Sequence, residues 1–130
     1  MKPDDFRRLA LSLPDTIEAS HMNHPDFRAR GKIFCTLAYP DDTYGMVILT
    51  PIDQDLFVQA DPNTFMPVPG AWGKQGSTRV HLASARVALV KKALSAAWQK
   101  ATTARSAKAA RKAPVRKKGV GTTVKRKGAR

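Results

Sequence analysis

The chain has 130 residues, of which 42% are hydrophobic, and a formal net charge of +13. This length predicts one domain with one modest core. The single cysteine, Cys35, excludes an internal disulfide framework and is typical of a reducing cytoplasm. The amino-terminal stretch MKPDDF contains no long apolar run, so we expect neither a signal peptide nor a membrane span.

The positive charge is concentrated at one end of the chain. Residues 101–130 contain 11 Lys and Arg and no Asp or Glu, which leaves 12 Lys and Arg against 10 acids in residues 1–100. The first part therefore carries a net charge of +2 and the second part +11. We interpret residues 1–100 as a folded domain and residues 101–130 as a disordered basic tail, because such a composition cannot bury enough apolar area to order itself.

The first predicted element is a helix over residues 3–13. Proline suits the first turn of a helix, and Asp4 and Asp5 favour its positive end. Pro14 ends the helix. An apolar stripe at helical spacing is formed by Phe6, Leu9, Ala10 and Leu13.

Residues 15–25 are predicted to be a polar, irregular connection. His21 and His24 lie in it, and Cys35 or His81 would have to complete a metal site with them. A closed zinc site takes four ligands in recognisable pairs, and this spacing is too loose for one. We therefore expect histidines that are bonded to the backbone or to water, and no metal.

Residues 27–37, FRARGKIFCTL, predict a β-hairpin. Apolar and charged residues alternate over 27–30, and 33–37 are rich in residues that favour strands. Gly31-Lys32 is the signal of a type II′ turn. A mid-strand thiol such as Cys35 is typically buried and inert. This register places Phe27, Ala29, Phe34 and Thr36 on one face, and Arg28, Arg30, Ile33 and Cys35 on the other.

The middle of the chain predicts two further strands around a helix. Residues 44–50 are apolar on both faces, which favours a central strand. Pro51 begins a short helix that continues to about residue 59. Residues 65–68 predict a short strand, which Pro67 confines to a sheet edge.

The next segment combines a glycine-rich loop with a last strand. The loop, residues 69–76, contains Trp72 and Lys74, departs from the phosphate-binding loop motif, and is not expected to contain a helix. Residues 77–82 predict a strand whose buried face carries Thr78, Val80 and Leu82 and whose other face carries Arg79 and His81.

A long amphipathic helix is predicted over residues 85–100, with Ser84 as its N-cap. We expect Trp98 in the core or at its edge. Its apolar stripe is formed by Val87, Val90, Leu94, Ala97 and Trp98.

Four sequence words, together with the order of these elements, resemble the MmcQ/YjbR-like family. The words are LALSLP (9–14), FRARGKIFCTL (27–37), ADPNTF (60–65) and VPGAWGKQGSTRVHL (68–82), and the resemblance covers about residues 3–100. It implies an α+β fold: a two-layer α-β(3)-α-β(2)-α domain whose antiparallel sheet has helices on one face, similar to secretion chaperones. Members are commonly described as DNA-binding proteins, with no agreed reaction or catalytic residues. The positions that match the family's recurrent motif are Gly31, Lys32, Trp72, Gly73 and Gly76.

The residue pattern does not predict an enzyme or a cofactor. The acids lie in turns and at helix starts, and none pairs with another for acid–base chemistry. The basic residues instead indicate nucleic acid: cations beside an aromatic side chain suit phosphate contact and base stacking. The alternative is a solvated face whose arginines pair with local acids. The candidate residues on the sheet and its border are Arg28, Arg30, Lys32, Trp72, Lys74 and Arg79. His81 shares their face.

The tail supplies the other candidates and looks like the tails of linker histones and of bacterial nucleoid-associated proteins. They are Arg105, Lys108, Arg111, Lys112, Arg116, Lys117, Lys118, Lys125, Arg126 and Lys127. We predict a cytoplasmic protein, with association with the nucleoid as one option. It is expected to bind DNA, or alternatively RNA, with low sequence specificity, because phosphate contacts carry no sequence information. A second hypothesis is a small protein- or ligand-interaction module that uses the open sheet face and the Trp72 loop, with the tail as a nucleic-acid tether. A pocket beside Trp72 favours this second hypothesis, and a flat, positive sheet face favours DNA.

Overall fold

One antiparallel sheet organises the structure, a computed structural model that describes residues 1–38 and 41–112, with side chains described up to residue 103. Its elements are α1 (Pro3–Leu11), β1 (Thr16–His21), β2 (His24–Ala29), β3 (Lys32–Leu37), β4 (Tyr44–Ile48), α2 (Pro51–Ala60), β5 (Phe65–Pro67), α3 (Ala71–Lys74), β6 (Ser77–His81) and α4 (Val87–Lys112). Among the described residues, no helix combines the length and the apolarity that crossing a membrane requires.

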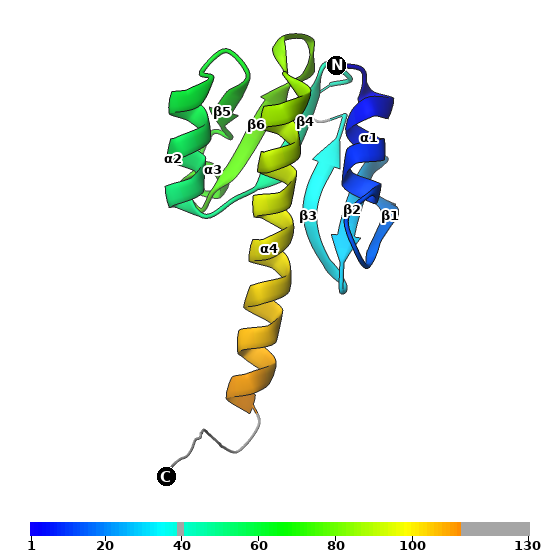
Figure 1. Ribbon diagram of the computed structural model, residues 1–130, viewed down its shortest axis with the longest axis vertical. Helices are drawn as coiled ribbons and strands as arrows, with labels where there is room; N and C mark the ends of the chain where they lie inside the picture. The colour runs from blue at the N-terminus through cyan, green and yellow to red at the C-terminus, as the bar shows by residue number, and fades with distance from the viewer. Residues whose placement is uncertain (39–40, 113–130) are drawn as a thin grey trace.

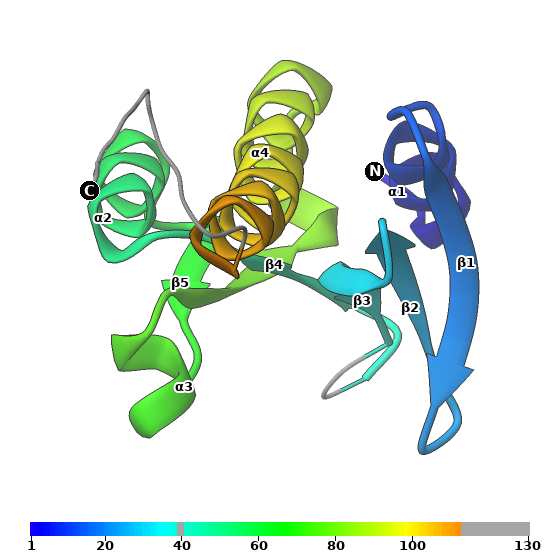
Figure 2. The same cartoon turned by 90° about the horizontal axis from the view of Figure 1, so that it is seen from below.

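The strand order is β1-β2-β3-β4-β6-β5, and every neighbouring pair is antiparallel. Helices α1, α2 and α4 cover one face of the sheet (Figure 1). Seen end-on, the short helix α3 and the turn between β1 and β2 project from the opposite side, which we call the open face (Figure 2). The predicted α+β class is confirmed, with α1, α2 and α4 on one face (Figure 2), and so are the central position of β4 and the edge position of β5.

The core lies between the sheet and the three helices. Alternation places Val80 and Leu82 of the β6 segment on the buried side, as predicted, and it places Val47 and Leu49 of the β4 segment on the same side. Their neighbours on the open face are only half-buried. The largest fully buried side chains are the four phenylalanines Phe6, Phe27, Phe34 and Phe65.

Strand β1 was not predicted. Residues 16–21, expected to be irregular, pair with β2 along their whole length. Met22 and Asn23 join the two strands, and both have positive φ (50° and 64°), as a two-residue hairpin turn requires. The sequence lacks the glycine that usually marks such a turn, and β1 buries little, with Ile17 62% exposed. The sequence therefore offered neither a turn glycine nor a buried apolar face from which this hairpin could have been predicted.

The β2–β3 hairpin is present, but its predicted turn and register are wrong. The turn is Arg30-Gly31, with φ of 53° and 83°, so that Ala29 lies opposite Lys32. The register then shifts at Phe27, which lies opposite Cys35. This irregularity lets the consecutive residues Phe34 and Cys35 both be fully buried, although the prediction placed them on opposite faces.

Two further predictions need correction. The glycine-rich loop contains α3, a single helical turn. Helix α4 begins at Val87, so Ser84 ends a 3-10 turn (Leu82–Ser84) instead of capping the helix. Val87 is 54% exposed and does not belong to the buried stripe.

Helix α4 also continues past residue 100, where the sequence analysis ends the domain, to Lys112. Ala101 and Thr102 on this extension are buried, so the packed part of the helix reaches at least residue 102. The predicted disorder of residues 113–130 lies outside the described residues. Trp98 lies at the core edge as expected, and its indole nitrogen donates to the carbonyl of Pro14 at 2.8 Å.

Candidate functional site

Trp72 stands on α3 at the border of the open face and is 65% exposed. The buried side chain of Gln54 fastens this turn to the body. Its amide nitrogen lies 2.9 Å from the carbonyl oxygen of Gly73 and 3.1 Å from that of Ser77. The large exposed ring is therefore carried by a segment whose backbone is anchored.

The glycines that follow Trp72 have a structural reason. A Cβ atom on Gly73 would lie 1.7 Å from the carbonyl oxygen of Val68, and one on Gly76 would lie 1.7 Å from that of Leu49. The close backbone approach excludes any side chain at either position. Because packing explains the glycines but not the exposed ring of Trp72, this tryptophan is the motif residue that most strongly indicates binding.

We expect Gly73→Ala to lower the free energy of unfolding by about 3 kcal/mol or more, because Val68 must move to admit the methyl group. Urea denaturation measures the effect. Gly70→Ala is the control: Gly70 has open space around it, so only the strain of its backbone (φ 85°, ψ −157°) opposes a methyl group, and we expect a loss of about 2 kcal/mol. Equal losses for the two variants would contradict the close approach.

A buried carboxylate lies on the same face. Asp26 is fully buried and accepts hydrogen bonds from Arg28 Nε at 2.8 Å and Nη2 at 3.1 Å. His21 Nδ1 lies 2.9 Å from its second oxygen. The Arg28 hydrogen bond is the main reason why the pKa of Asp26 is lowered from its ordinary value, with His21 adding to it and burial opposing it. The same hydrogen bond raises the pKa of Arg28.

Two predicted phosphate-binding arginines are therefore already paired. Arg28 is held by Asp26, and Arg30 lies in the β2–β3 turn with its Nε 3.3 Å from Asp15. Arg30 is thus not on the open face, contrary to the predicted register. For these two residues the structure shows the alternative considered from the sequence, in which arginines pair with local acids.

Arg79 differs from both of them. It lies in the middle of β6, opposite Met46, with its guanidinium carbon 5.9 Å from the centre of the Tyr44 ring. Its Nε is buried without a hydrogen-bond partner, and no ion pair within the described residues includes Arg79. The pKa of Asp41 is lowered mainly by hydrogen bonds from Thr43, and the positive charge of Arg79 lowers it further.

A pocket of about 290 Å³ is lined by residues of α3 and of the β1–β2 hairpin. Helix α3 and the β1–β2 turn lie on the side of the sheet away from the long helices (Figure 2). Trp72 forms one wall. Cross-strand pairing aligns Asp26, Thr36, Met46 and Arg79 in one row across the sheet, and the pocket lies over the middle of this row. The lining residues are His21, Met22, His24, Thr36, Met46 and Trp72.

Lys32 and Lys74 border other surfaces. Lys32 lies opposite the buried Ala29, and its charge contributes, after burial, to lowering the pKa of Lys100 on α4. It therefore belongs to the helix-covered side. Lys74 is exposed at the end of α3.

The predicted tail residues fall into two groups. Positions 105, 108, 111 and 112 lie within α4, whose end projects beyond the sheet (Figure 1). The others lie outside the described residues: Arg116, Lys117, Lys118, Lys125, Arg126 and Lys127.

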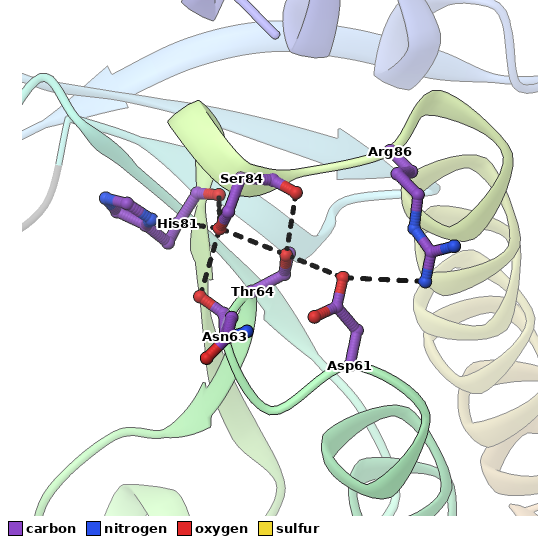
Figure 3. Close-up of polar contacts among 6 residues, drawn as sticks. All are labelled: Asp61, Asn63, Thr64, His81, Ser84 and Arg86. Carbon is purple, nitrogen blue, oxygen red and sulfur yellow. Dashed lines mark hydrogen bonds and ion pairs between the residues drawn. The ribbon is translucent and has the colours of Figure 1, made fainter.

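A second polar cluster, not predicted from the sequence, joins the α2–β5 connection to the end of β6 (Figure 3). Ser84 Oγ lies 3.0 Å from His81 Nδ1, a distance suitable for a nucleophile and its base. However, Asp61 contacts Thr64 at 2.8 Å and Arg86 at 3.8 Å instead of orienting the histidine. The hydroxyl of Ser84 also lies 3.0 Å from the carbonyl of Asn63. This pattern is that of a structural tie between segments.

Metal ligands and a reactive thiol do not converge here. Within the part of the chain that the structure describes, no group of three or more His, Cys, Asp or Glu could hold a metal ion. His21 and His24 face each other across the β1–β2 hairpin. Cys35 is fully buried, and burial, followed by the charge of Asp26, raises the pKa of its thiol well above the ordinary value.

These features define an α+β domain in which helices cover one face of a six-stranded antiparallel sheet and the other face carries a pocket. The chain belongs to the YjbR family, whose model matches residues 11–100. It is also similar to the crystal structure of Deinococcus radiodurans protein DR2400, which has a DUF419 domain. The TM-score is 0.70 at 20% identity over 95% of this chain and 97% of the other, which shows a shared fold. None of the curated proteins matches the chain.

Proposed function

We propose that this YjbR-family protein is a non-enzymatic DNA-binding protein whose basic carboxy-terminal segment binds phosphate with little sequence preference. One observation carries the proposal: residues 101–130 hold 11 of the 23 Lys and Arg and none of the 10 acids. A chain of such charge attracts polyphosphate, and counterion release supplies the affinity. RNA offers the same chemistry, and either partner would place the protein in the cytoplasm.

The helix that ends the described chain supports this proposal. At about 3.6 residues per turn, positions 105, 108 and 112 lie on the same side of α4 as the buried stripe that includes Val90, Leu94 and Ala97. The face of α4 that packs on the sheet thus continues, past the end of the sheet, as a row of basic positions. Lys32 and Lys100 lie near this end and add to its charge.

The folded body contributes less to the proposed affinity, because its open face carries a pocket beside Trp72, which favours the second hypothesis of a ligand-interaction module for this part of the chain. Arg28 and Arg30 are paired with acids, and residues 1–100 carry a net charge of only +2. Of the cations predicted on the sheet and its border, Lys32, Lys74 and Arg79 remain for DNA phosphate. Because contacts to phosphate carry no sequence information, the expected binding is nearly independent of base sequence.

The test is a salt series with the full chain and several unrelated DNA duplexes of equal length. If about half of the tail cations contact phosphate, the slope of log affinity against log salt is about −5. We expect this slope for every duplex, with affinities that agree within about threefold. A slope near zero, or a strong preference for one duplex, would contradict the proposal. An RNA duplex in the same series measures how far binding depends on the kind of polyanion.

A further inference from the structure

We propose that the open-face pocket is a binding site for a small planar aromatic anion, with Trp72 against its ring and Arg79 at its charged group. This proposal does not depend on the basic carboxy-terminal segment. It concerns a cavity on the body of the protein, and it names a different class of ligand from the DNA proposed above.

The walls of the pocket suit a flat apolar molecule. Trp72 lies on one side and Met22, which is 84% exposed, on the other, while Met46 and Thr36 form the floor. A tryptophan face stacks on aromatic rings, and methionine side chains adapt to their shape. The volume of about 290 Å³ is at the lower end for small-molecule sites, so a molecule of one or two rings is the appropriate size.

The charge beside the pocket selects an anion. Arg79 lies directly opposite Met46 on the neighbouring strand, so its side chain is next to the pocket floor. It has no ion-pair partner among the described residues, and its buried Nε lacks a hydrogen bond. The buried Nε is out of a ligand's reach, but Arg79 is only half-buried, so the terminal nitrogens of its guanidinium would donate charge-assisted hydrogen bonds to an acceptor oxygen of the ligand. Arg28 cannot compete for the same anion, because both oxygens of Asp26 already engage it.

The surrounding polar groups are set in place before any ligand arrives. Asp26 holds Nδ1 of His21 at 2.9 Å, which fixes a ring that lines the pocket. Gln54 and the close approach at Gly73 hold the turn that carries Trp72. A preorganised site loses little freedom on binding, and this favours recognition of a small molecule.

The experiment uses the full chain and two matched probes, 2-naphthoate and its neutral analogue 2-naphthamide. The chain has two tryptophans, so NMR resolves one indole N–H signal from the pocket and one from Trp98, whose N–H is bonded to Pro14. We expect 2-naphthoate to shift the Trp72 signal in a saturable way and to leave the Trp98 signal in place. The amide is expected to bind about tenfold more weakly, because it cannot form the charge-assisted bond.

Three variants separate the roles of the residues. Arg79→Gln should reduce naphthoate affinity about tenfold, to the level of the amide, whereas Lys91→Gln, on the exposed surface of α4, should change it less than twofold. Trp72→Ala, monitored by ligand-detected NMR, should abolish binding of both probes while the unfolding midpoint stays the same. An unmoved Trp72 signal, an equal shift of Trp98, equal affinity for the two probes, or no effect of Arg79→Gln would each overturn the proposal.

Discussion

Replacing all 11 Lys and Arg of residues 101–130 by glutamine is expected to lower DNA affinity by about a thousandfold at roughly 0.1 M salt. The slope of log affinity against log salt should change from about −5 to about −1, because few phosphate contacts remain. Fluorescence anisotropy with a labelled duplex measures both quantities. The substitution leaves every residue of the described core unchanged, so the unfolding transition of the body should be preserved.

The control for this prediction is the substitution of Lys91 and Lys92, two exposed cations on α4, by glutamine. It should change the affinity by less than about threefold. A partial variant, changed only at residues 105, 108, 111 and 112, separates the helical part of the segment from the rest and should remove roughly a third of the slope. If the full substitution left the slope unchanged, DNA binding would have to come from the body, and the proposed function would be wrong.

Replacing Arg28 by methionine is expected to lower the free energy of unfolding by about 3 kcal/mol at pH 7. The substitution keeps an apolar stem but leaves the fully buried carboxylate of Asp26 without its guanidinium. His21 remains as a partner, and Arg28 is itself 34% exposed, so the expected loss is at the lower end for a broken buried pair. Arg30→Met is the control: its pair with Asp15 is exposed, and we expect a loss of about 0.5 kcal/mol or less.

The pH dependence of this loss identifies its cause. The folded-state pKa of Asp26 is lowered, so its contribution to stability is present above the unfolded pKa of about 4 and disappears as the pH falls through the folded value. Without Arg28 the largest cause of this lowering is lost, so the folded-state pKa of Asp26 is higher in the variant than in wild type. The difference in unfolding free energy between wild type and Arg28→Met should therefore be smaller at about pH 4 than at pH 7. A difference that did not change with pH would contradict the role assigned to Asp26.

The elements that the sequence predicted correctly are those that bury a face. Alternation around Val80 predicted β6 with the right side facing inward, and the apolar residues on both faces of 44–50 predicted the central position of β4. Strand β1 escaped prediction because pairing with β2 holds it in place while its side chains remain largely exposed. A strand of this kind depends on a neighbour whose position the local sequence does not state.

The candidate site was predicted less completely than the fold. The family motif led to Trp72, and the strand pattern led to Arg79. The pocket was not predicted as a structure, because it needs the β1–β2 turn and α3, two features absent from the predicted fold. The pairing of Arg28 with Asp26 depends on the geometry of the folded strand, which sequence periodicity does not determine.

Helix α4 joins the packed body to the basic segment without a break, so the connection between the two is rigid. From Thr102 to Lys112 it extends for about 15 Å with no swivel point. A domain joined by a flexible linker would rotate freely above a DNA duplex. Here the orientation of the domain would follow that of the bound end of α4. Neighbouring molecules bound to DNA through the end of α4 would therefore present their Trp72 pockets in the same orientation.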